Sequence, residues 1–402
     1  MGDGQARGWM LPALLLACGV FAATQIGKLP PAIPALRGEF GASLVQMGWL
    51  ASIFNIVAAV GGLGAGWVAD RLGRRVLLKL GMLVLGAGAL GGALAPSFAL
   101  LYPLRVIEGV GFLCIVVAAP TLLREAVAPA RLRLALGVWS GYTSLGMAAM
   151  LLLAPWLLQV AGWRGGWWVG AAGALLFGAL VLAFFPGRGT VVPASAGGPG
   201  GLVHGLRHAA PWCMAGCFGL YTLQWMALAV WMPTLLVEEE GRTLAAAGAL
   251  AALMVVVNAP GNVLGGWLSQ RRWPILALLA GPAAVMGLAG WAVFALPMAP
   301  ELRVALCVAF SLVGGVLPAA VYAAVPAVAA RNGNLGAVNG LMVQASNVGT
   351  LAGPPLAASL VASGGWHAVA PLFLAGALLS GALALLASRT LVPELSLGEV
   401  LR

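Results

Sequence analysis

Apolar runs long enough to cross a lipid bilayer recur along the whole chain, separated by short polar loops. In the first half they span residues 9–34, 47–68, 76–95, 100–122, 134–160 and 167–185, and in the second half 211–232, 247–268, 274–296, 304–329, 335–360 and 368–387. A transmembrane helix needs about 20 apolar residues, so the pattern predicts twelve of them. Residues 186–210, rich in Pro, Gly and Ser, predict a linker between a bundle at 1–185 and a bundle at 211–402.

The composition excludes a water-soluble domain, because 61% of the residues are hydrophobic and only 8% are charged. We therefore predict an all-α membrane protein whose main surroundings are lipid. The net charge of +10 sits in short loops rather than in a patch, so we expect no nucleic-acid partner. All five cysteines lie within apolar runs, which disfavours a disulfide framework. No cluster with metal-ligand spacing and no nucleotide-binding loop is present, so we expect no metal and no cofactor.

The basic residues predict the orientation of the helices. If the N-terminus and the linker are cytoplasmic, fifteen of the 21 Lys and Arg residues fall on the inner side, four on the outer side and two within helices. Short cytoplasmic loops are enriched in Lys and Arg. The sequence thus predicts a multi-pass protein of the inner (cytoplasmic) membrane with both termini in the cytoplasm.

The two halves of the chain repeat each other. Gly66-Trp67-Val68 recurs as Gly266-Trp267-Leu268, and Gln25, nine residues before Pro34, matches Gln224, nine residues before Pro233. Internal duplication is typical of secondary transporters. We therefore predict two pseudo-symmetric six-helix bundles.

The loop GWVADRLGRR, residues 66–75, joins the second and third predicted helices. Its spacing of Gly, Asp and Arg resembles the loop between helices 2 and 3 of major facilitator superfamily transporters. The resemblance implies a twelve-helix transporter fold in which Asp70 caps a helix of the other bundle and Arg74 pairs with Glu125 when the inner side is closed. The gating motif expected from it comprises Gly66, Asp70, Arg71, Gly73, Arg74, Arg75 and Glu125.

The fourth predicted helix contains Arg105, Glu108, Gly109 and Gly111, which resemble a motif of the same superfamily. There the arginine is associated with substrate or proton handling. An arginine at mid-bilayer costs about 2.5–3.5 kcal/mol, so Arg105 should face a cavity or a partner. Glu108 lies on the same helical face, where it either only neutralises Arg105 or carries a coupling proton.

Lys28 interrupts the first helix, three residues after Gln25. Its side chain either extends to the membrane surface or lines a central cavity. Together with Arg105 and Glu108 it gives a net intramembrane charge of +1, which favours a small anionic substrate. The neutral and basic residues that we expect to line the cavity are Gln25, Lys28, Arg105, Tyr221, Gln224, Gln344 and Asn347.

These observations predict a monomeric secondary active transporter that moves a small anion by alternating access, with protons as a second partner if Glu108 couples them. If Glu108 stays ion-paired, the protein is a uniporter or an exchanger. The run Leu136 to Ser140 and Ala154-Pro155-Trp156 resemble the fifth helix of cyanate-permease-type members of the superfamily. One alternative is a multidrug or metabolite efflux transporter of the same fold. A multi-pass membrane enzyme or sensor is disfavoured, because no acids, histidines or nucleophiles cluster at a membrane face and the loops are too short for an output domain.

Overall fold

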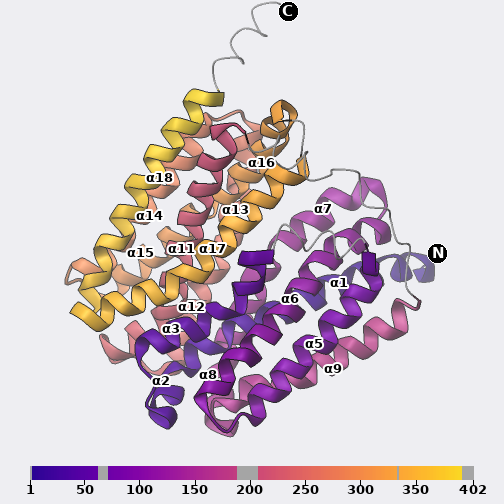
Figure 1. The fold of residues 1–402 in the computed structure, drawn as a ribbon, viewed down its shortest axis with the longest axis horizontal. Coiled ribbons are helices and arrows are strands. Elements are labelled where there is room, and N and C mark those ends of the chain that lie inside the picture. Colours follow the sequence, from indigo (N-terminus) through magenta and orange to yellow (C-terminus); the bar gives the residue numbers. More distant parts are fainter. Residues whose placement is uncertain (1, 62–70, 188–206, 333–334, 392–402) are drawn as a thin grey trace, which may run out of the picture. The chain divides into compact units, whose positions relative to one another are not determined.

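The computed structural model describes residues 2–61, 71–187, 207–332 and 335–391, and every regular element in these ranges is a helix (Figure 1). The helices associated with the first half are α1 (Gly2–Gly27), α2 (Leu29–Phe40), α3 (Leu44–Ser52), η1 (Ile53–Asn55), α5 (Arg74–Leu94), α6 (Phe98–Ala126), α7 (Pro129–Ser140), α8 (Tyr142–Ala161) and α9 (Arg164–Phe184). The later helices are α11 (Ala209–Glu238), α12 (Leu244–Val256), α13 (Asn258–Gln270), α14 (Ile275–Ala295), α15 (Pro300–Gly314), α16 (Val316–Asn332), α17 (Leu335–Gly364), η2 (Trp366–Val369) and α18 (Ala370–Leu391).

Eleven helical stretches within the described ranges are long and apolar enough to cross a membrane. The remaining predicted segment, 335–360, corresponds to α17, whose 30 residues are also long enough to span a bilayer. This helix contains Gln344, Asn347 and Thr350 and is less apolar than the others. The prediction of an all-α membrane protein is confirmed.

Five of the predicted single spans are interrupted, which hydropathy alone does not reveal. The interruptions lie at Lys28, at the 3₁₀ turn η1, at Gly141, at Val257 and at Gly315. The first has a clear cause. Pro30 and Pro31 follow Lys28 and have no N–H group to continue the helical hydrogen bonding of α1.

The chain divides into two compact units. The first consists of Met1–Ala194 and Val230–Val256, and the second of Ser195–Ala229 and Val257–Arg402. The boundary after Ala194 falls inside the linker expected at 186–210. Helix α12 belongs to the first unit because it packs closely on α8, where a methyl group at Gly248 would lie 2.7 Å from the Leu151 carbonyl oxygen. The division into bundles 1–185 and 211–402 stays a prediction.

In the first unit, α5 lies between α6 and α9 (Figure 1). Leu78, Leu85, Ile115 and Val181 are fully buried in the core that these helices share with α1. Glycine allows α5 to approach α6 closely, since a methyl group at Gly88 would lie 2.8 Å from the backbone nitrogen of Glu108. The close approach fixes the position of Glu108 against α5.

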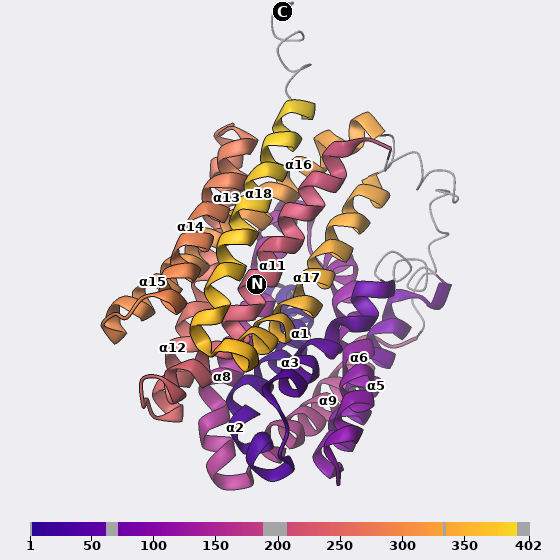
Figure 2. The same cartoon turned by 60° about the vertical axis from the view of Figure 1, so that its left-hand side comes forward.

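In the second unit, α14 packs along α18 and against α15 (Figure 2). Phe373 of α18 stacks on Phe294 with ring centroids 5.4 Å apart and meets Phe310 edge-on at 5.7 Å. Aromatic pairs in these geometries stabilise a core beyond the area that they bury.

Candidate functional site

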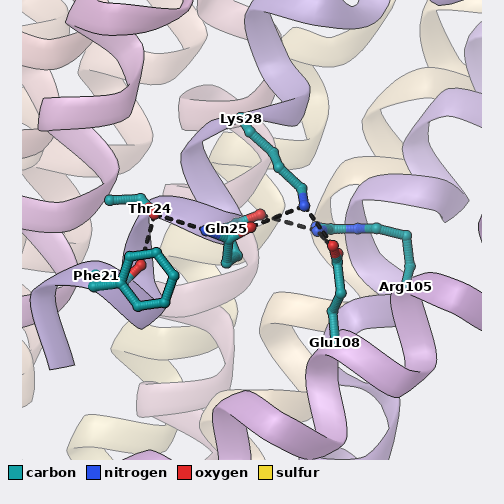
Figure 3. Close-up of polar contacts among 6 residues, drawn as sticks. All are labelled: Phe21, Thr24, Gln25, Lys28, Arg105 and Glu108. Carbon is teal, nitrogen blue, oxygen red and sulfur yellow. Dashed lines mark hydrogen bonds and ion pairs between the residues drawn. The ribbon is translucent and has the colours of Figure 1, made fainter. Parts of the chain in front are cut away.

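Four polar side chains meet inside the first unit, at the junction of α1 and α2 and on α6. Gln25, Lys28, Arg105 and Glu108 are each at most 2% exposed. Figure 3 shows Lys28 from above and Arg105 from the right reaching the Glu108 carboxylate, with Gln25 beside Lys28. We call these four residues the charged cluster.

The break between α1 and α2 positions Lys28. Its amide N–H donates to the Thr24 carbonyl, a helical bond that continues α1 up to Lys28, shortly before Pro30 and Pro31. The Lys28 side chain has no exposed surface and reaches α6. The alternative that Lys28 extends to the membrane surface is therefore wrong.

Hydrogen bonds join every member of the charged cluster. Lys28 Nζ donates to Gln25 Oε1 at 2.9 Å and to Glu108 Oε1. Arg105 Nη1 donates to Glu108 Oε2 at 2.6 Å and to the Gln25 carbonyl oxygen at 2.9 Å. Each carboxylate oxygen of Glu108 thus faces one cation.

The charged cluster is electrostatically unbalanced, because two cations share one carboxylate. Arg105 Nε is buried and has no hydrogen-bond acceptor among the described residues. The guanidinium lies over the Phe54 ring, with Cζ 4.5 Å from the ring centroid. One positive charge and one donor therefore stay uncompensated, an arrangement that suits a negatively charged ligand.

Two aromatic residues of the site, Phe54 and Trp167, were not predicted from the sequence. Trp167 on α9 is fully buried, and its ring centroid lies 4.4 Å from Lys28 Nζ. Thr24 was missed as well; its Oγ1 accepts from Gln25 Nε2 at 2.9 Å and orients that amide. In an apolar sequence with 15 Trp and 12 Phe, nothing in the pattern distinguishes these aromatic residues from ordinary core residues.

The second unit holds the predicted neutral residues, in a different arrangement. Tyr221 accepts a hydrogen bond from Asn258 Nδ2 at 2.9 Å, and Asn258 also donates to the Ser311 carbonyl at 2.9 Å. Asn258 was not predicted, although its place at the start of α13, after the interruption at Val257, explains its position.

The other neutral residues form fewer contacts. The Oε1 atoms of Gln224 and Gln344 are buried without a partner in the described part of the chain. Asn347 donates to the Val343 carbonyl of its own helix at 2.8 Å. The structure brings Tyr221 into a hydrogen-bond network but joins it to none of Gln224, Gln344 and Asn347 by a described hydrogen bond.

The predicted gating motif is described only in part, because Gly66 and Asp70 lie outside the described residues. Gly73 has φ 83° and ψ 137° just before α5, a conformation that favours glycine. Arg74 Nη1 lies 3.3 Å from Glu125 Oε1, so the expected contact is present. Of the other two arginines, Arg75 donates to the Pro186 carbonyl at 3.2 Å, and Arg71 is exposed. A gating role for this motif stays a prediction.

Within the described residues, no three His, Cys, Asp or Glu side chains are grouped so that they could hold a metal ion. The ionisable groups that the charged cluster contains are Lys28, Arg105 and Glu108.

Comparison with known proteins identifies the family. Residues 15–329 match the Major Facilitator Superfamily. The chain is 29% identical over 291 residues to the probable sulfoacetate transporter SauU of Cupriavidus necator, covering 66% of each protein. It is 33% identical over 155 residues to the 4-hydroxybenzoate transporter PcaK of Acinetobacter baylyi, covering 38% of this chain and 34% of that one. Neither relative is matched over its whole length.

The fold is shared with a solved structure, a bacterial homolog of the human lysosomal transporter Spinster in an inward-facing and occupied conformation. The TM-score is 0.77 at 18% identity, covering 94% of this chain and 96% of that one. The resemblance stated from the loop 66–75 and the helix-four motif is confirmed: this chain belongs to the major facilitator superfamily, a family of membrane transporters and not of enzymes.

Proposed function

We propose that the chain is a secondary active transporter for a small organic anion that carries a carboxylate or sulfonate group. The observation that carries this proposal is the charged cluster, in which Lys28 and Arg105 share the single carboxylate of Glu108. An unbalanced charge buried in a membrane protein is costly unless a partner neutralises it. A bound anion supplies the missing charge.

Two of the similar transporters support the same substrate class. Sulfoacetate and 4-hydroxybenzoate, named for these two, are small organic anions. Carriers of anions and carriers of cations differ in the net charge that their binding site requires. A carrier of lipophilic cations would need surplus negative charge, whereas the cluster has surplus positive charge.

Transport would run by alternating access between the two sides of the inner membrane, with both termini cytoplasmic as the distribution of Lys and Arg indicates. The predicted loop gate, with Arg74 against Glu125, would close the cytoplasmic side.

A binding measurement on the purified protein tests the proposal. Titration calorimetry with 4-hydroxybenzoate and sulfoacetate should give saturable heats, while 4-hydroxybenzamide, which has the same ring and no charge, should give none. Arg105→Gln should abolish the anion signal. Equal binding of the amide and the carboxylate would contradict an anion site.

A transport measurement completes the test. Proteoliposomes that contain the chain should take up a labelled anion faster than protein-free liposomes, and an excess of the same unlabelled anion should compete. If the protein takes up a lipophilic cation and Arg105→Gln takes it up equally fast, the substrate is a cation and the proposed anion selectivity is wrong.

A further inference from the structure

Lys28 Nζ has surroundings that fit both of its protonation states. It has two hydrogen-bond acceptors, Gln25 Oε1 and Glu108 Oε1. A neutral amine has two N–H donors, which matches this number, whereas an ammonium has three. The Trp167 ring, with its centroid 4.4 Å from Nζ, stabilises the ammonium through its π face.

The charge balance singles out Lys28 among the three ionisable groups. Arg105 keeps its charge at any pH that a protein survives. Protonation of Glu108 would leave two buried cations facing each other without a counter-ion. Loss of the Lys28 proton is the only single change that makes the empty cluster neutral.

Among the described residues, the contacts around Lys28 include no titratable side chain besides Arg105 and Glu108. From α6 it faces Arg105 and Glu108. From α9 it faces Trp167 and Gly166, where a methyl group would lie 3.1 Å from Lys28 Cβ. From α8, the neighbouring Gly27 meets Met147 and Met150. Among the described contacts, the net charge around Lys28 Nζ therefore depends only on Lys28, Arg105 and Glu108.

We propose that Lys28 carries the coupling proton. In the empty site its amine is neutral; when an anion enters, the amine takes one proton from water, and the loaded cluster is again neutral. The proton leaves when the anion leaves, so anion and proton cross together. The proposal rests on the anion-transport function and changes one expectation: Glu108 becomes the fixed counter-ion of Arg105 rather than the proton carrier.

Calorimetry of 4-hydroxybenzoate binding in buffers of different ionisation enthalpy counts the protons taken up per anion. The wild type should take up close to one proton per anion over the pH range in which the Lys28 amine is neutral in the empty site and protonated in the loaded site. In that interval the affinity should fall about tenfold per pH unit as pH rises, because one proton is linked to one anion. Binding without proton uptake at every pH would overturn the proposal while leaving the anion site intact.

Three variants locate the proton. Lys28→Arg, which is permanently charged, should bind the anion with no proton uptake and no pH dependence. Glu108→Gln should lose the uptake too, because the anion then neutralises Arg105 without a proton. Lys79→Arg, at the only other lysine of the chain, should behave as the wild type. Proton uptake that persists in Lys28→Arg would assign the proton to Glu108 instead.

Arginine is larger than lysine, and Gly166 packs against Lys28, so a variant that needs no extra space is tested beside Lys28→Arg. Lys28→Met then serves as the second variant. It mimics the neutral amine and should bind the anion weakly, without proton uptake, at every pH. If no probe anion binds to the wild type at any pH, the proposed function itself fails, an outcome distinct from binding without protons.

Discussion

Lys28 donates a hydrogen bond to Glu108 across 80 positions of sequence, and neither side chain has any exposed surface. The bond ties the junction of α1 and α2 to the middle of α6. Because Glu108 also accepts from Arg105, the three charges form one electrostatic unit.

The first prediction concerns the stability of this unit. Glu108→Gln leaves Arg105 without its buried counter-ion and should lower the free energy of unfolding by about 3–5 kcal/mol. Lys28→Met/Glu108→Gln removes both partners of the Lys28–Glu108 hydrogen bond and should cost less than the sum of the single changes, by about 0.5–3 kcal/mol. Thermal unfolding of the purified variants measures both quantities. Lys79→Met, at a partly exposed lysine bound to the Gly187 carbonyl, is the control and should have little effect. Strict additivity would contradict a shared charge balance.

The second prediction concerns the shape of the Arg105 side chain. Arg105→Lys keeps the charge but loses the planar group that contacts Gln25, Glu108 and the Phe54 ring together. Loss of a hydrogen bond to a charged group costs about 1.5–3 kcal/mol, so anion affinity should fall at least about tenfold. Titration calorimetry checks this. Arg37→Lys, in the partly exposed pair with Glu238, should leave affinity unchanged. Retained affinity in Arg105→Lys would show that charge alone suffices.

The third prediction concerns the glycine beside the charged cluster on α6. A methyl group at Gly109 would lie 1.9 Å from the Phe54 carbonyl oxygen, so Gly109→Ala must push η1 away from α6. Overpacking of this kind costs about 1–3 kcal/mol, and the displaced Phe54 should weaken anion binding too. Gly137→Ala, on α7 with nothing within 4 Å, should instead be neutral or stabilise the helix by up to about 1 kcal/mol. Thermal unfolding measures the stability of the two variants, and titration calorimetry measures their anion affinity. Equal stability and equal affinity of the two variants would contradict the close packing of η1 on α6.

The fourth prediction concerns the pair of Arg74 and Glu125. Both side chains are partly exposed, and such pairs contribute about 0–1 kcal/mol. Arg74→Gln should therefore barely change the free energy of unfolding, yet change the rate of anion uptake by liposomes if the pair gates the site. Arg389→Gln, in the last turn of α18, is the control at a different position. An unchanged rate of anion uptake in Arg74→Gln would show that the Arg74–Glu125 pair does not gate the site.

The sequence predicted the membrane helices and the family well, because hydropathy, loop charges and the motifs at 66–75 and 105–111 are local signals. It also identified Lys28, Arg105 and Glu108, since charged residues are rare within apolar runs. It did not predict that all three meet. That contact depends on the break before Pro30 and on the glycine packing of α5 against α6, which are matters of three-dimensional geometry.

The neutral residues were harder to interpret. Tyr221 and Asn347 were grouped by position on predicted inner helices, yet the partner of Tyr221 is Asn258, and Asn347 bonds its own backbone. Side-chain amides and hydroxyls can form hydrogen bonds with the nearby backbone as readily as with residues distant in the sequence. Their sequence positions therefore carry less information than those of buried charges.

The shared charge balance of Lys28, Arg105 and Glu108 also bears on how this protein can evolve. Replacement of Arg105 or Glu108 alone leaves the other charge without its counter-ion in the membrane interior, so such a single substitution should destabilise the protein. A homologue that lacks Glu108 should also lack Lys28 or Arg105, or should have gained an acid nearby. Positions 28, 105 and 108 should therefore change together among homologues. Homologues that differ at all three positions should also differ in the charge of their substrate.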